Sequence, residues 1–287
     1  MGKKLSTWRQ IALTTWTKPH DPTAYGVLDL DVEEALQYLA ALRESSGEKV
    51  TLTHLVGKAV AMAMFDVPEV NAFVSFGNLV QRKTIDVFFQ VSFFDKDDTA
   101  EKKVEPGEKV STDEKKPNLA GAKVRETDLK DLATICKELR EKAEKIRGHQ
   151  HDEVETMKGA KTLAMMPTAM VGWATKTGGF LSYDLGLNLS RFGIPFDAFG
   201  SCMVTNVGTF GIPLAMAPLV AFSRVPMVLT LGVIRDAPSV WEGKLCIRKR
   251  ASIGIAFDHR VMDGYHAGIM AKKFTAIVEN PKAYFAA

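Results

Sequence analysis

The stretch SIGIAFDHRVMDGYHAG, residues 252–268, decides how the last part of the chain folds. Its first half alternates apolar and small residues, which is typical of a strand with one buried face. The alternation stops at Asp258, His259 and Arg260, and a second acid, Asp263, follows before a helix-like pattern begins. The end of a buried strand is a frequent position for functional residues in α/β proteins. The stretch therefore predicts a strand, a polar corner and a helix.

Strand and helix patterns alternate along the rest of the chain. Alternation with period two predicts strands, and apolar residues with helical period predict helices. The predicted strands are 24–32, 79–83, 85–94, 118–126, 202–207, 227–235 and 245–258, and the predicted helices are 32–44, 50–68, 127–149 and 265–278. Because several strands near the end follow one another without helices between them, the pattern favours an α/β (α+β) domain with a mixed sheet over a doubly wound one.

Local signals place two helix starts and two unusual segments. Thr51 or Thr53 is expected to cap the helix over 50–68, and Thr127 the helix over 127–149. Residues 95–117 have almost no apolar side chains, which predicts a solvated surface loop. Residues 150–200 mix apolar helical stretches with many glycines. No break in composition divides the chain, so we expect a single domain over residues 1–287.

Composition excludes several classes of protein. An apolar fraction of 46% over 287 residues is ordinary for a globular domain with its own core. A net charge of +3 with interleaved acids and bases argues against nucleic acid as a partner. Three widely spaced cysteines indicate a reducing compartment and no disulfide framework. The absence of a signal-peptide pattern and of an apolar run of about 18 residues predicts a cytoplasmic protein without a membrane span.

His259 has the chemistry of a general acid–base residue, because the pKa of imidazole lies near neutral pH. Gly264 allows a tight turn into the last helix. Spacing alone leaves a second interpretation open, in which His259 is a structural histidine held by an ion pair. His259, Asp263 and His266 also have conceivable metal-ligand spacing, but we predict no metal. His54, at a helix start, is expected to be structural.

A second unusual stretch is VTNVGTFGI, residues 204–212. Thr205 and Asn206 end a predicted strand, and their hydroxyl and amide groups can donate hydrogen bonds to a developing oxyanion. The alternative is a glycine-rich turn between strands, and the residues by themselves do not distinguish the two. No phosphate-binding glycine loop opens a helix and no G-x-S-x-G elbow is present, so a dinucleotide fold and a serine hydrolase have little support.

Together, these two stretches resemble the catalytic domain of the 2-oxoacid dehydrogenase acyltransferases and, more distantly, chloramphenicol acetyltransferase. Residues 258–264 match the family motif D-H-R-x-x-D-G completely, and residues 205–211 (TNVGTFG) are similar to its S-N-L-G-x-F-G. LSTWRQIA at 5–12 is similar to the family's opening motif. The resemblance spans nearly the whole chain and implies the mixed-sheet sandwich of CoA-dependent acyltransferases.

The resemblance also implies a role for each matching residue. His259 would be the general base that removes a proton from the thiol or hydroxyl attacking an acyl-CoA thioester. Thr205 stands where the family has a serine whose hydroxyl stabilises the oxyanion. Asp263 would hold the geometry of the site through an arginine, for which Arg9 is a candidate. Asn206, in the second motif, would support the site.

Further expectations follow from the same resemblance. Gly264 would support the catalytic corner, CoA or acyl-CoA would be a substrate, and no metal would be needed. The histidine and the hydroxyl donor would come from different subunits of a homotrimer, and the apolar tail over 278–287 would join trimers into a larger cage. No lipoyl or subunit-binding domain is recognisable, so a lipoyl-domain protein would act in trans.

The identity of the acyl acceptor stays open. A dihydrolipoamide-like thiol, a small hydroxyl or an amine is compatible with the motifs, because acceptor choice depends on pocket walls. The segment 150–200, an insert relative to the family, would cover the acceptor entrance or the trimer surface. The rival hypothesis is a non-catalytic core protein that kept the fold for assembly.

Overall fold

The structure, a computed structural model, describes residues 21–93, 118–147, 168–190 and 196–285. Its centre is a seven-stranded sheet in the order β1-β9-β7-β6-β4-β5, with β8 paired to β9. The strands of this sheet are β1 (Thr23–Asp31), β4 (Val87–Phe93), β5 (Asn118–Val124), β6 (Cys202–Asn206), β7 (Met227–Leu231), β8 (Arg235–Trp241) and β9 (Lys244–Asp258). β6 runs parallel to β4 and β7, and the other pairs are antiparallel. The predicted fold class, a mixed sheet flanked by helices, is confirmed.

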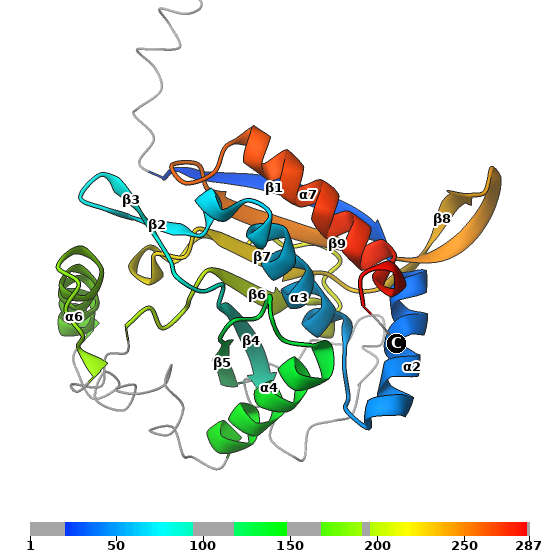
Figure 1. Ribbon diagram of the computed structural model, residues 1–287, viewed down its shortest axis with the longest axis horizontal. Helices are drawn as coiled ribbons and strands as arrows, with labels where there is room; N and C mark the ends of the chain where they lie inside the picture. Colours follow the sequence, from blue (N-terminus) through cyan, green and yellow to red (C-terminus); the bar gives the residue numbers. More distant parts are fainter. Residues whose placement is uncertain (1–20, 94–117, 148–167, 191–195, 286–287) are drawn as a thin grey trace, which may run out of the picture.

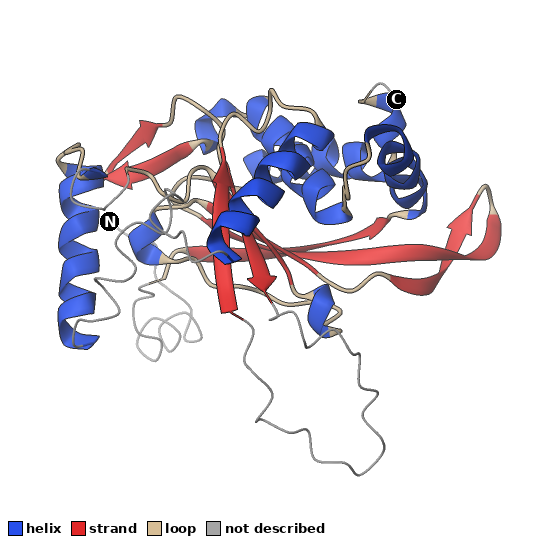
Figure 2. Cartoon of the chain, turned by 90° about the horizontal axis from the view of Figure 1, so that it is seen from below, coloured by secondary structure: helices blue, strands red, loops and turns tan. Residues whose placement is uncertain are grey.

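Four long helices lie on one side of this sheet (Figures 1 and 2). They are α2 (Glu33–Ser46), α3 (Leu52–Phe65), α4 (Leu132–Arg147) and α7 (Gly264–Glu279). A fifth helix, α6 (Thr168–Gly179), stands apart from this layer in Figure 1 and continues into a π-helical turn at Phe180–Asp184. The separate hairpin of β2 (Ala72–Ser75) and β3 (Asn78–Gln81) and four short 3-10 turns, Pro68–Val70, Gly208–Phe210, Ala221–Ser223 and Pro281–Ala283, complete the described elements.

The alternation in β9 separates two apolar layers. Ile253, Ile255 and Phe257 face the helices, where they join the main core. Gly254, between them, faces the other way, and a Cβ atom there would lie only 2.0 Å from the carbonyl oxygen of Ala215. A second, smaller core on that face is covered by the segment that connects β6 to β7. The glycine therefore lets this segment lie directly on the sheet.

Two predicted boundaries were wrong. α4 begins at Leu132, because Asp131 caps it: its carboxylate accepts hydrogen bonds from the Thr134 backbone N–H at 2.7 Å and from the Thr134 hydroxyl at 2.8 Å. The predicted cap, Thr127, is buried and its hydroxyl donates to the carbonyl of Val124 at 2.9 Å. The Thr127 hydroxyl therefore stabilises the turn after β5 and does not cap α4.

The strand predicted over 227–235 is two strands, β7 and β8. Between them Gly232 donates its N–H to the carbonyl of Ser252 at 2.9 Å, and a Cβ atom at this glycine would collide with the carbonyl of Pro213. β2 was not predicted, and the predicted loop 95–117 lies outside the described residues.

The small face of α3 lies against the sheet, and we expect Gly57→Ala to destabilise the protein. A Cβ atom at Gly57 would lie 2.2 Å from Cζ of Phe89, whose side chain is fully buried and has little room to move. Overpacking of this kind costs about 1–3 kcal/mol of unfolding free energy, which urea titration measures. The control is Gly172→Ala in α6, where nothing lies within 4 Å of the added atom. It should leave stability unchanged or raise it by up to about 1 kcal/mol; equal losses in both variants would refute this account of α3.

Candidate active site

The corner between β9 and α7 is fixed by main-chain hydrogen bonds. The N–H of Asp258 donates to the carbonyl of Pro226 and that of His259 donates to the carbonyl of Pro22, each at 2.9 Å. Pro226 immediately precedes β7 and Pro22 immediately precedes β1. The N–H of Met262 then donates back to the carbonyl of Asp258 at 3.0 Å, which closes a tight turn. His259 is therefore held on both sides by the two strands that flank β9.

Within this turn, Asp258 and Arg260 bind each other and leave His259 outside the pair. The buried carboxylate of Asp258 accepts hydrogen bonds from the Arg260 backbone N–H at 2.9 Å and from its guanidinium at 2.6 Å. This pairing raises the pKa of Arg260. His259 is exposed, with its ring 6.1 Å from the ring of Phe257. Across the described residues no ion pair holds the His259 ring, so the structural-histidine interpretation gains no support.

Asp263 begins α7. Its carboxylate accepts hydrogen bonds from the backbone N–H groups of Tyr265 at 2.9 Å and His266 at 3.2 Å, and it lies 2.7 Å from the Nδ1 atom of His266. The backbone N–H of His266 is the main cause that lowers the pKa of Asp263. Gly264 is the first, exposed residue of the helix. Asp263 thus fixes where α7 starts, and the candidate arginine partner, Arg9, lies outside the described residues.

The residues considered for a metal do not converge. Asp263 and His266 contact each other at the helix start, while His259 lies beside Phe257 on the preceding turn. In the part of the chain that the structure describes, no group of three or more histidine, cysteine or acidic side chains is placed to hold a metal ion.

Thr205 lies at the half-buried end of β6, and Asn206 fixes the turn that follows it. The Asn206 amide donates to the Thr53 hydroxyl at 3.0 Å, and its carbonyl oxygen accepts from the N–H of Gly208 at 2.9 Å. A Cβ atom at Gly208 would lie 2.6 Å from the carbonyl of Gly232, so only glycine permits this contact between two backbones. Asn206 and Gly208 therefore hold the end of β6 in one position.

The sequence did not reveal which residues hold the Asn206 side chain in place. Thr53, which binds Asn206, and His54 lie in the first turn of α3. The N–H of Thr51 donates to Nδ1 of His54 at 2.9 Å, so the histidine completes a capping box. Burial is the main cause that lowers the pKa of His54 to about 4. The expected structural role of His54 is confirmed; the T-x-x-H spacing was the available signal, but it does not reveal the contact with β6.

Within a single chain, Thr205 and His259 lie far apart. Across the sheet, Thr205 pairs with Thr230, which pairs with Gly254. His259 comes five residues after Gly254, which is about 17 Å along a strand at about 3.3 Å per residue. The faces also differ: Thr205 shares the face of Met203 and the smaller core, whereas His259 lies beside Phe257 on the helix side. The two groups cannot act on one atom within a single chain.

The sequence of the chain matches the model of a known protein family. The model of the 2-oxoacid dehydrogenases acyltransferase (catalytic domain) family matches residues 4–96 and 198–286. Over 84 residues the chain is 31% identical to the lipoamide acyltransferase component of the branched-chain alpha-keto acid dehydrogenase complex of Pseudomonas putida. This match covers 29% of the chain and 19% of that relative, so the matched part spans about a fifth of the relative's length.

Two solved structures have a similar fold. The cubic core of the pyruvate dehydrogenase multienzyme complex has a TM-score of 0.61 at 18% identity, over 99% of this chain and 93% of that one. The dihydrolipoamide acetyltransferase of Azotobacter vinelandii has a TM-score of 0.61 at 18% identity, over 92% of this chain and 84% of that one. At this identity the likeness shows the fold.

The low pKa of His54 predicts a pH-dependent loss of stability. Because the folded-state pKa (about 4) lies below the ordinary 6.5, the stabilisation from neutral His54 is complete above pH 6.5 and is lost as the pH falls toward 4. Between pH 7 and pH 5 the wild type should lose about 1–2 kcal/mol more unfolding free energy than His54→Gln. Glutamine can complete the same capping box without titrating. Urea unfolding at both pH values measures the difference, and identical losses would contradict the assignment.

Proposed function

The chain belongs to the family of 2-oxoacid dehydrogenase acyltransferase catalytic domains, and on that premise we propose that it moves an acyl group between coenzyme A and a dihydrolipoamide-like thiol. His259 is the general base and Thr205 of a neighbouring copy is the oxyanion donor. The observation that carries the proposal is the corner from β9 to α7, where the complete family motif holds His259 exposed on a rigid backbone.

The chemistry follows from the two side chains. Neutral His259 removes the proton of the attacking thiol, and the thiolate adds to the carbonyl carbon of the thioester. The negative oxygen then accepts a hydrogen bond from the Thr205 hydroxyl, and collapse of the adduct expels the other thiolate, which takes the proton from the imidazolium. A general base contributes about 10²–10⁴-fold to such a step and one oxyanion donor about 10²–10³-fold.

A solved relative supports these assignments. In the Azotobacter vinelandii dihydrolipoamide acetyltransferase, the role of a serine, a histidine and an asparagine in the catalytic mechanism was investigated, the last two being four residues apart. His259 and Asp263 have the same spacing here. We propose that Asp263 positions the site, and the hydrogen bonds of its carboxylate to the start of α7 support this role.

The separation of Thr205 from His259 supports a site shared between two copies, and we propose a homotrimer. The hairpin of β8 and β9 extends beyond the body of the molecule in Figure 1. Val240, Leu245 and Ile247 on one face of the hairpin are each more than 70% exposed. An apolar face on a projecting hairpin is typical of a surface covered by another subunit.

Contacts of the segment 150–200 support a role for it in acceptor binding. Its Asp184 forms an ion pair with Arg224 at 2.6 Å, and Phe180 packs against Phe76 of the β2–β3 hairpin. Arg224 also lines a pocket of about 90 Å³ whose wall includes Asp258 and Arg260 of the catalytic corner. We therefore propose that this segment shapes the acceptor side of the site. Because a different wall there would admit a different acceptor, a small hydroxyl or amine acceptor is the second candidate.

Assembly and location complete the proposal. A lipoyl-domain protein would deliver the thiol in trans, and the C-terminal tail would join trimers into a cage. A structure of similar fold is the cubic core of the pyruvate dehydrogenase multienzyme complex, which supports a larger assembly. Among the described residues, no helix is long and apolar enough to span a membrane. We propose a cytoplasmic location, and the non-catalytic core protein remains the rival that an activity assay excludes.

Subunit mixing tests the shared site. We expect His259→Ala and Thr205→Val each to lose at least about 10²-fold in transfer between acetyl-CoA and dihydrolipoamide. Trimers that contain both variants, purified through two different tags, should regain about a third of the wild-type activity, because one interface of three pairs the two intact groups.

Two outcomes would contradict this arrangement. Mixed trimers as inactive as their parents would refute the shared site, and an active His259→Ala protein would refute the general base. Thr205→Ser, which keeps the hydroxyl, is the control and should retain most of the activity.

The hairpin carries a separate prediction. Leu245→Asp places a charge on its exposed apolar face and should convert the trimer to monomers, with loss of transfer activity. Light scattering measures the mass. The matched control, Lys244→Asp, places the same charge on the opposite face and should remain trimeric. A trimeric Leu245→Asp protein would exclude this face from the interface.

A further inference from the structure

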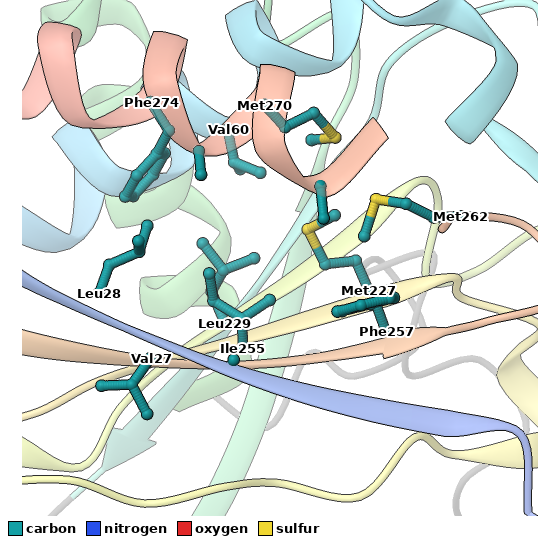
Figure 3. A pocket seen from close by; sticks show the side chains of 13 residues that line it. Val27, Leu28, Val60, Met227, Leu229, Ile255, Phe257, Met262, Met270 and Phe274 are labelled. Carbon is teal, nitrogen blue, oxygen red and sulfur yellow. The ribbon is translucent and has the colours of Figure 1, made fainter. Parts of the chain in front are cut away.

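An apolar cavity of about 130 Å³ lies between the sheet and α7 (Figure 3). Its floor is formed by β1, β7 and β9, and its roof by α7 with a contribution from α3. The side chains labelled in the figure, such as Leu28, Leu229 and Phe274, are aliphatic, aromatic or methionine. An enclosed cavity of about 150 Å³ with such a lining stays free of water and binds benzene or xenon. This one is open on one side, so a ligand can enter it.

A glycine keeps this space open. Gly26 lines the cavity from β1, opposite Ile255 of β9, and a Cβ atom built on it has nothing within 4 Å. Its backbone is ordinary extended strand, so the conformation does not require glycine. Gly57 and Gly121, in contrast, would bring a Cβ atom within about 2 Å of a phenylalanine ring. The absence of a side chain at Gly26 therefore leaves space rather than relieving a collision.

The cavity reaches the catalytic corner. Phe257, which lines it, precedes His259 by two residues, and the two rings lie 6.1 Å apart. Met262, inside the D-H-R-x-x-D-G motif, lines the same end with Met227, and Figure 3 shows both methionines beside Phe257. Methionine side chains adapt their shape to different occupants. A group attached to the atom on which His259 acts can thus continue past Phe257 into the cavity.

We propose that this cavity binds the aliphatic chain of the transferred acyl group. The inference rests on the proposed function and specifies its substrate class: a medium-length acyl thioester of about six to eight carbons, since the cavity has the size of one that takes benzene and the first carbons span the rim at Phe257. The apolar lining offers no partner to a charged acyl terminus, so the substrate is a plain aliphatic acyl group rather than a dicarboxylic one.

Chain-length selectivity tests the proposal. Transfer from acetyl-, hexanoyl- and octanoyl-CoA to dihydrolipoamide is measured as kcat/KM for the wild type and for Gly26→Leu, which fills the cavity from β1. Each buried methylene contributes about 0.8 kcal/mol, or about fourfold, so the wild type should favour hexanoyl-CoA over acetyl-CoA by at least about tenfold. Gly26→Leu should lose this preference, with hexanoyl-CoA and acetyl-CoA transferred at similar kcat/KM.

Matched variants isolate the cavity. Tyr25→Leu introduces the same residue on the opposite, exposed face of β1 and should keep the wild-type preference. Ala271→Leu fills the cavity from α7 and should reproduce Gly26→Leu, which keeps the proposal testable if the latter does not fold. Independently of turnover, saturating benzene should raise the midpoint of thermal unfolding of the wild type and have no effect on the filled variants.

The outcomes separate the two proposals. Turnover of acetyl-CoA without a preference for longer chains, or a preference that survives in both filled variants, overturns the acyl cavity and leaves the acyltransferase intact. Failure to turn over any acyl-CoA overturns the proposed function and the acyl cavity with it. No response to benzene in the wild type shows that the cavity takes no apolar ligand and overturns the inference.

Discussion

Strand β9 pairs with β1, β7 and β8, and the end of this strand is where the backbone of His259 is held. The hydrogen bonds from Asp258 to Pro226 and from His259 to Pro22 attach the corner to the strands on either side. Because β9 lies between β1 and β7, the histidine cannot shift without breaking the pairing of the sheet. The position of the candidate general base is thus set by strand register, and Asp263 only has to begin the next helix.

The same register separates the two halves of the site. β6 is parallel to β7, and β9 is antiparallel to β7, so the ends of β6 and β9 point in opposite directions. Thr205 lies in the last part of β6, and His259 directly follows the end of β9. A sheet with this order keeps them apart within one chain, and in the proposed function a second copy would supply the missing group. The proposed trimer would answer this separation, and the exposed apolar face of the β8–β9 hairpin is where a neighbouring copy would pack.

Glycines determine how closely the layers approach in three places, and in a fourth a glycine leaves a cavity. Gly254 and Gly232 let the segment after β6 lie on the sheet, and Gly57 makes room for Phe89 under α3. Gly26 is different because nothing occupies the space beside it. One residue type thus produces close packing in three places and a cavity in the fourth, and the sequence pattern around each glycine does not distinguish them.

Local information in the sequence determined most of the strands, the four long helices and both motifs, because alternation, helical period and short-range motifs depend on neighbouring residues. It placed His259 after a strand and Thr205 at the end of another. It did not reveal that Asp131 rather than Thr127 begins α4, that Thr53 binds Asn206, or that Gly26 faces empty space. Those features depend on contacts between residues far apart in the chain. Only the tertiary structure decided them, because strand order and register bring such residues together.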